Sequence, residues 1–142
     1  MPARRRATIA AAIVLLLTLA GCSSSKGDGR ECYDVSAELM AAIADGANDI
    51  PITPVDAAAV KSEHFDDAYI VAMSFTAPGG GEEVGVWAVA TLEPPYGPIL
   101  AVDGFAHEFT VWPHEINGDE INGDELDATE DGVTEAKACL EG

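Results

Sequence analysis

The segment from residue 115 to residue 135 holds the densest set of groups in the chain that could bind a metal ion. The unit Glu-Ile-Asn-Gly-Asp occurs twice in succession, at 115–119 and 120–124, and the segment has nine acidic residues and no basic residue. Ca²⁺ prefers oxygen ligands, and an EF-hand loop supplies them from alternate positions, with glycine at position 6 and a bidentate acid at position 12. The spacing of these acidic residues can therefore be compared with the ligand positions of an EF-hand loop.

The doubled unit does not fit an EF-hand loop. With Gly118 or Gly123 at position 6, position 1 is Pro113 or Gly118, and neither side chain can bind a cation. With Gly132 at position 6, position 12 is Ala138, which cannot chelate. The candidate ligands in that frame are Asp127, Thr129, Asp131 and Glu135. We therefore expect at most a weak extracellular Ca²⁺ site, no other cofactor, and a solvated acidic loop over 115–131.

Enzymatic chemistry has little support in the residue pattern. The G-x-S-x-G motif of serine hydrolases does not occur. His107 and His114 each precede a glutamate, but this is not the H-E-x-x-H zinc motif, and a helix would have to continue through Pro113 to place both on one face. We expect these histidines and His64 to face solvent. The remaining carboxylate candidates are Asp66, Asp67, Asp103 and Glu108.

Three large aromatic residues could stack on a sugar ring. They are Trp87, Tyr96 and Trp112. In a domain of this size we expect them to lie in the core instead, because each buries a large apolar area.

The N-terminus has the organisation of an export signal. Arg4, Arg5 and Arg6 precede an apolar run from Ala7 to Ala20. As a helix this run would cover about 21 Å, which is shorter than the ~30 Å hydrocarbon core of a bilayer. A basic start and a short apolar run that ends in small residues are typical of a signal peptide. The sequence is compatible with export by the Sec pathway and by the twin-arginine pathway.

The run ends in Leu19-Ala20-Gly21-Cys22, which resembles the lipobox of bacterial lipoproteins. The resemblance implies that Cys22 carries a diacylglycerol and that residues 1–21 are removed. It also implies anchoring to the outer face of the cell membrane. The polar residues 22–30 predict a flexible tether, and residues 31–142 predict one globular domain.

The charge of the exported chain limits its partners. Removal of residues 1–21 takes away three of the seven basic residues and none of the 25 acids. Such a surface repels nucleic acid and anionic headgroups. The expected partners are the membrane through its lipid anchor, and an envelope protein or a small neutral or cationic ligand.

Cys32 and Cys139 remain after Cys22 is used for lipid attachment. Disulfides persist in exported proteins, and the chain has no C-x-x-C pair for metal or redox chemistry. We predict that the two cysteines pair. Closing this long loop is worth about 4–5 kcal/mol in the chain-entropy model.

Both ends of the domain predict helices. Apolar residues recur at helical spacing over 34–45, before Gly46, and again over 131–140. Asp131 is well suited to cap the second of these helices, whose apolar face includes Cys139.

The middle of the domain predicts strands. Strict alternation at 68–76 and a partner run at 84–92 flank the glycines at 79–81, which indicates a hairpin. Shorter strands are expected at 59–65 and 99–102, after an extended connector that contains two prolines.

Residues 103–112 allow two interpretations. Phe105, Phe109 and Trp112 would share one face of a helix capped by Asp103, whereas alternation of apolar residues would also suit a strand. We favour the helix. The predicted fold is α+β: an antiparallel meander of three or four strands, packed by the N- and C-terminal helices on one sheet face.

Several runs resemble small secreted lipoproteins of high-GC actinobacteria: "CYDVSAEL", "VGVWA", "AVDGFAHEFTVWP" and "EAKACL". The resemblance implies no activity. We expect a lipid-anchored binding or interaction module at the cell envelope, which an exposed aromatic surface would favour. A weak calcium-dependent module that uses residues 115–135 is the alternative, and a small hydrolase is the least favoured.

Overall fold

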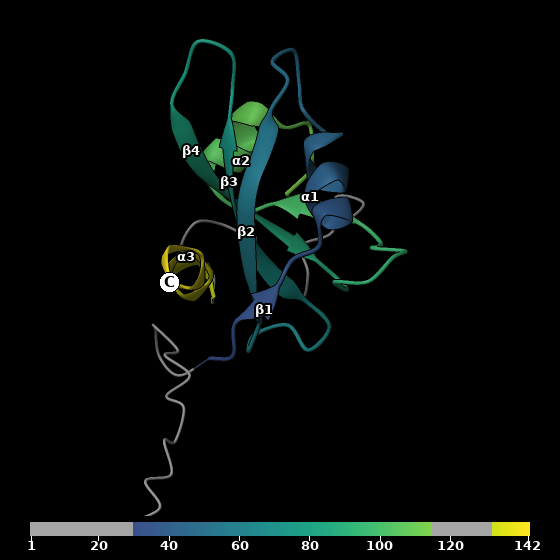
Figure 1. Ribbon diagram of the computed structural model, residues 1–142. Helices are drawn as coiled ribbons and strands as arrows, with labels where there is room; N and C mark the ends of the chain where they lie inside the picture. Colours follow the sequence, from purple (N-terminus) through teal and green to yellow (C-terminus); the bar gives the residue numbers. More distant parts are fainter. Residues whose placement is uncertain (1–29, 115–131) are drawn as a thin grey trace, which may run out of the picture.

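The computed structural model describes residues 30–114 and 132–142. The predicted signal peptide, Cys22 and the acidic loop at 115–131 lie outside these ranges. Within them the chain forms five strands and three helices (Figure 1). In chain order these are β1 (Tyr33–Asp34), α1 (Ala37–Ala44), β2 (Thr53–Lys61), β3 (Tyr69–Thr76), β4 (Glu82–Val89), β5 (Ile99–Ala101), α2 (Gly104–Phe109) and α3 (Val133–Glu141).

The strands form one sheet in the order β1-β2-β3-β4-β5, with every neighbouring pair antiparallel. The predicted α+β fold with an antiparallel meander is confirmed, but the described sheet has five strands, not three or four. The additional strand is β1, whose two residues pair with Ala59 and Ala58. Two residues are too few to produce a periodic pattern, so sequence analysis missed this strand.

Strand β2 begins and ends earlier than the strand predicted at 59–65, and residues 62–65 lie outside it. It begins at Thr53 and includes Pro54, which lay in the predicted connector. Proline is tolerated here because β1 pairs only with Ala58 and Ala59, so this end of β2 is a sheet edge. The register between β2 and β3 shifts between Pro54 and Asp56, which accommodates the irregular backbone.

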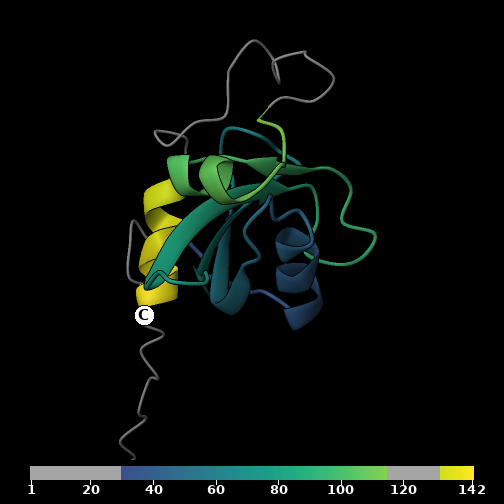
Figure 2. The ribbon, with the colours of Figure 1, turned by 90° about the horizontal axis from the view of Figure 1, so that it is seen from above.

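The sheet is covered on both faces, and the prediction that the helices share one face was wrong. Val71 and Met73 of β3 belong to a core cluster that includes Leu39 and Ile43 of α1. Alternate β3 residues belong to a second cluster with α3, which lies across the sheet from α1 (Figure 2). Because successive residues of β3 are apolar and buried, each face of the strand needs its own cover.

Helix α1 begins three residues later than predicted, because β1 takes up Tyr33 and Asp34. The Ser36 hydroxyl caps it by accepting a hydrogen bond from Leu39 N at 3.1 Å. The helix ends just before Gly46, as predicted. A Cβ at Gly46 would lie 2.2 Å from the Trp112 indole, so this glycine makes room for the ring.

Helix α2 confirms the helical interpretation of residues 103–112 and the cap at Asp103, although it ends at Phe109. The predicted common face of its aromatics was wrong, because Phe109 and Trp112 pack against the α1 side of the core while Phe105 is 41% exposed. Helix α3 has Gly132 as its N-cap, with φ 92° and no side-chain cap, instead of the predicted Asp131.

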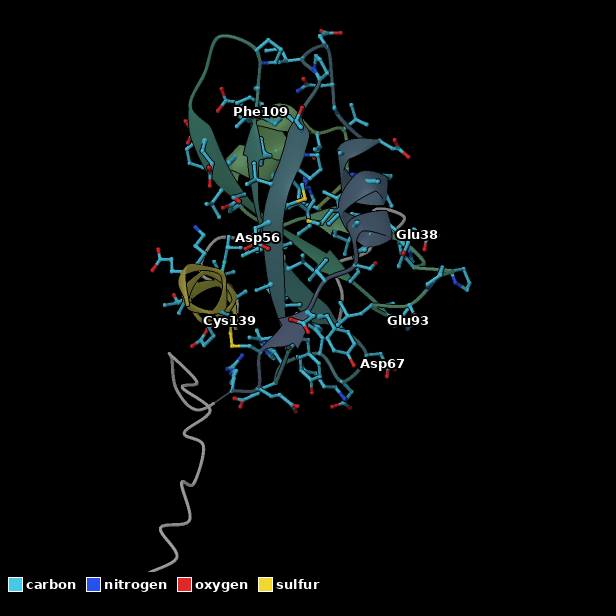
Figure 3. All side chains as sticks on the ribbon, viewed as in Figure 1. Glu38, Asp56, Asp67, Glu93, Phe109 and Cys139 are labelled. Atoms are coloured by element: carbon cyan, nitrogen blue, oxygen red, sulfur yellow. A yellow bond between two sulfur atoms is a disulfide. The ribbon has the colours of Figure 1, made fainter. Side chains whose placement is uncertain are left out.

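The predicted disulfide between Cys32 and Cys139 is confirmed, with a Cα–Cα distance of 5.7 Å. It joins the residue before β1 to the last turns of α3 (Figure 3). The start of the domain is therefore covalently fixed to its final helix.

A candidate binding groove beside strand β4

The structure leaves most of the candidate metal ligands untested. Asp127, Thr129 and Asp131 lie outside the described residues, and Glu135 lies in the first turn of α3. Among the described residues, no group of three or more His, Cys, Asp or Glu side chains is arranged to hold a metal ion.

His107 and His114 lie close together, although the sequence did not predict this contact. Helix α2 ends at Phe109, well before Pro113, so the two histidines do not share a helix face. The chain instead turns back after the helix and brings the two rings to a centroid separation of 5.3 Å. Both residues are exposed. His64 is also exposed, and its ring lies beside Phe65.

Trp87, Trp112 and Tyr96 contribute to the core on the α1 side of the sheet, which agrees with the expectation from their size. Trp87 is fully buried and donates from Nε1 to the Thr110 hydroxyl at 3.2 Å. Trp112 donates from Nε1 to the Ile43 carbonyl at 2.8 Å. In the described part of the chain, Phe105 is the one Phe, Tyr or Trp side chain that is classed as exposed.

Phe105 lines a groove of about 310 Å³ between β4, α2 and α3. Val84 and Leu140 are the other apolar residues of its lining. The charged residues of the lining are Glu82, Glu83, Lys137 and Glu141. We refer to this site as the β4 groove. It combines an apolar surface with an acidic rim.

The groove runs along a part of β4 that pairs with β3 on one side but, among the described residues, has no neighbouring strand on the other. Strand β5 pairs only with Trp87, Ala88 and Val89. The backbone of the next residue, Val86, forms hydrogen bonds with two residues that follow β5 in the chain. Val102 N donates to the Val86 carbonyl at 2.9 Å, and Val86 N donates to Asp103 Oδ1 at 3.1 Å.

These two hydrogen bonds establish the direction of the remaining backbone groups of β4. Val86 directs both its N–H and its C=O away from β3. Backbone direction alternates along an antiparallel strand. Val84 and Glu82 therefore direct their N–H and C=O groups to the same side as Val86. There, beside the groove, the described chain provides no strand to pair with them.

Asp103 connects the three elements that form the groove. Its side chain is only 5% exposed, and Oδ1 accepts hydrogen bonds from Val86 N of β4 and Ala106 N of α2, the latter at 3.0 Å. Oδ2 lies 3.4 Å from Nζ of Lys137 on α3. The cap role of Asp103 was predictable from the sequence, but its contacts with β4 and α3 depend on the tertiary structure.

A second, smaller cleft of about 180 Å³ lies near the start of the domain. Its lining includes Arg30, Tyr33, Lys61 and Glu63, and Arg30 forms an ion pair with Glu63 at 3.1 Å. The Tyr33 hydroxyl donates to the Glu31 carboxylate at 3.0 Å, and this hydrogen bond raises the pKa of Tyr33. The cleft has mixed charge, whereas three of the four charged residues that line the β4 groove are acidic.

Comparison with protein-family models, curated proteins and solved structures found no match to this chain. In the ranges 30–114 and 132–142, every helix is too short or too polar to cross a bilayer.

Proposed function

We propose that this protein is a lipid-anchored extracytoplasmic module that binds a partner at the cell envelope. Two observations support the location. The sequence from Arg4 to Cys22 has the organisation of a lipoprotein signal. The bond between Cys32 and Cys139 suits an oxidising compartment outside the cytoplasm.

The β4 groove is the observation that carries the binding role. Its apolar lining includes an aromatic side chain that is 41% exposed. Beside it lie an acidic rim and strand backbone that no strand of the described chain pairs with on this side. Apolar surface with a few polar groups to orient a ligand is typical of binding sites. Exposed aromatic residues are also enriched where proteins bind one another.

The position of the disulfide supports the same proposal. Cys139 is directly followed by Leu140 and Glu141, which line the groove. The bond to Cys32 therefore fixes one wall of the groove to the segment that leads to the tether. A wall held in this way costs less entropy to order when a partner binds.

Lipid attachment at Cys22 is the first expected result of this proposal. The mature protein should begin at Cys22, and its N-terminal peptide should have the mass of a diacylglycerol-modified cysteine. Cys22→Ser should abolish both the modification and membrane association, because serine lacks the thiol that the lipid occupies. Mass spectrometry and membrane fractionation measure these outcomes. A serine variant still cleaved at this position and still membrane-bound would contradict the proposed anchor.

A position-specific cross-link is the expected result for the binding role. A photo-reactive amino acid in place of Phe105 should form a discrete adduct with an envelope protein in intact cells. The matched control is the same amino acid in place of Glu38, an exposed residue on α1 across the sheet. Gel mobility and mass spectrometry identify adducts. Equal adducts from both positions, or none from Phe105, would contradict binding at the groove.

A further inference from the structure

We infer that the β4 groove binds an extended basic peptide segment, which adds as a strand beside residues 82–85 of β4. This inference rests on the proposed binding function and names the chemistry of the partner. It follows from the side of β4 that has no strand partner among residues 30–114 and 132–142, from the lining of the groove, and from the charge of its rim.

The backbone of β4 provides the template. The N–H and C=O groups of Val84 and Glu82 face the open side of the strand, in line with the groups of Val86 that already form hydrogen bonds. An edge strand with unpaired groups can accept another strand through main-chain hydrogen bonds. A peptide there would continue the ladder that β5 and Val102 begin.

The groove provides side-chain contacts for such a peptide. Side chains of an added strand alternate between the two faces of the sheet. Those on the α3 side would meet Val84, Phe105 and Leu140, which favours an apolar or β-branched residue at every second position. A volume of about 310 Å³ is at the lower end of ligand sites, so a short segment suffices.

The charges of the rim specify a basic partner. Glu82, Glu83 and Glu141 are acidic, and Lys137 is already paired with the buried Asp103. A second copy of this chain that paired through the same edge would bring acidic side chains against one another, which is destabilising. The acidic segment 115–131 has no basic residue and carries the same sign of charge as the rim.

A designed peptide tests the inference directly. The probe is a fluorescent peptide of alternating lysine and valine, about seven residues long, which supplies positive charge and β-branched side chains with the period of a strand. The acylated full-length protein is placed in nanodiscs of zwitterionic phosphatidylcholine, so that no anionic lipid attracts the peptide. Fluorescence anisotropy measures the affinity, with empty nanodiscs as the baseline.

Val84→Pro should weaken binding at least tenfold, because proline lacks the N–H that the inference assigns to the added strand. The ladder with β3 should remain, since that N–H faces away from β3. Val84→Ala is the matched control, which loses side-chain methyl groups but keeps the N–H, and should change affinity less than threefold. Binding that is equal in the proline variant and the alanine control would overturn the inference.

The peptide itself supplies a test that does not depend on how the variants fold. N-methylation of every second peptide amide keeps the charge of the peptide but removes hydrogen-bond donors. Two such peptides are made, one methylated at the odd positions and one at the even positions. At least one of them should bind at least tenfold more weakly than the parent peptide. Glu82→Lys with Glu83→Lys should also weaken binding at least tenfold, whereas Glu38→Lys should not. If both methylated peptides bind as tightly as the parent peptide, strand addition is wrong.

Hydrogen exchange locates the contact. The amides of Val84 and Glu82 should exchange more slowly when the peptide is bound, because they become donors in a ladder. Unchanged exchange at both amides in the saturated complex would overturn the inference. The inference can fail while the proposed function holds. A partner that is cross-linked through position 105 but does not add a strand to β4 would still show a binding module.

Discussion

Replacing both Cys32 and Cys139 with serine is expected to lower the free energy of unfolding by about 2–5 kcal/mol, the range for a native disulfide in a small secreted domain. The two cysteines are 107 positions apart, so the bond restricts almost the whole unfolded domain. For a domain of this size, each kcal/mol corresponds to roughly 4–8 °C in Tm. We expect thermal unfolding, followed by circular dichroism, to shift down by at least ~10 °C.

The control for this prediction uses a reductant. Reduction of the parent protein should reproduce the lower Tm, and the same reductant should leave the double serine variant unchanged. Both cysteines are replaced together, because a single replacement leaves a thiol that can form intermolecular bonds. A variant that unfolds at the parent temperature would contradict a stabilising role for the bond.

Asp103→Ala is the second variant with a large expected effect, a loss of about 2–4 kcal/mol. Removing a helix cap costs about 1 kcal/mol. Leaving the buried N–H of Val86 without its acceptor costs about 1–3 kcal/mol more. The ion pair with Lys137 adds little, because the lysine side chain is 41% exposed. Urea unfolding measures the change, which should appear as a lower midpoint with a similar slope.

Two further variants separate the roles of the Asp103 side chain. Asp103→Asn keeps an oxygen that can accept from Val86 N and Ala106 N, so it should lose clearly less stability than the alanine variant. Lys137→Met should cost no more than about 1 kcal/mol, the usual value for an exposed ion pair. If Asn and Ala variants are equally destabilised, the charge of Asp103 is the dominant contribution and the hydrogen-bond explanation is wrong.

Local sequence patterns were sufficient for the elements that contain their own signals. The alternation at 68–76 predicted β3, and the position of Asp103 before a helical run predicted the cap of α2. The last helix needed only its apolar face, although its cap proved to be Gly132. In each case the deciding interactions lie within a few residues along the chain.

The predictions that failed required information from distant residues. Strand β1 exists because Tyr33 and Asp34 meet β2, more than twenty residues away. The helices occupy both faces because β3 is buried on both sides. His107 and His114 approach one another because the chain turns back after Phe109, which their spacing along a continuous helix did not suggest.

By itself, the sequence determined the α+β class, the pairing of Cys32 with Cys139, and the start of α2 at Asp103. Periodicity, the number of available cysteines and capping chemistry are local or compositional properties. Only the tertiary structure decided that the β4 groove exists. Strand β5 ends at Ala101 because Asp103 starts a helix two residues later. In the described chain, this leaves the first half of β4 paired with β3 but without a second strand on its other side. An open edge depends on how far one strand extends along another, and that relation is established only when the strands and helices pack.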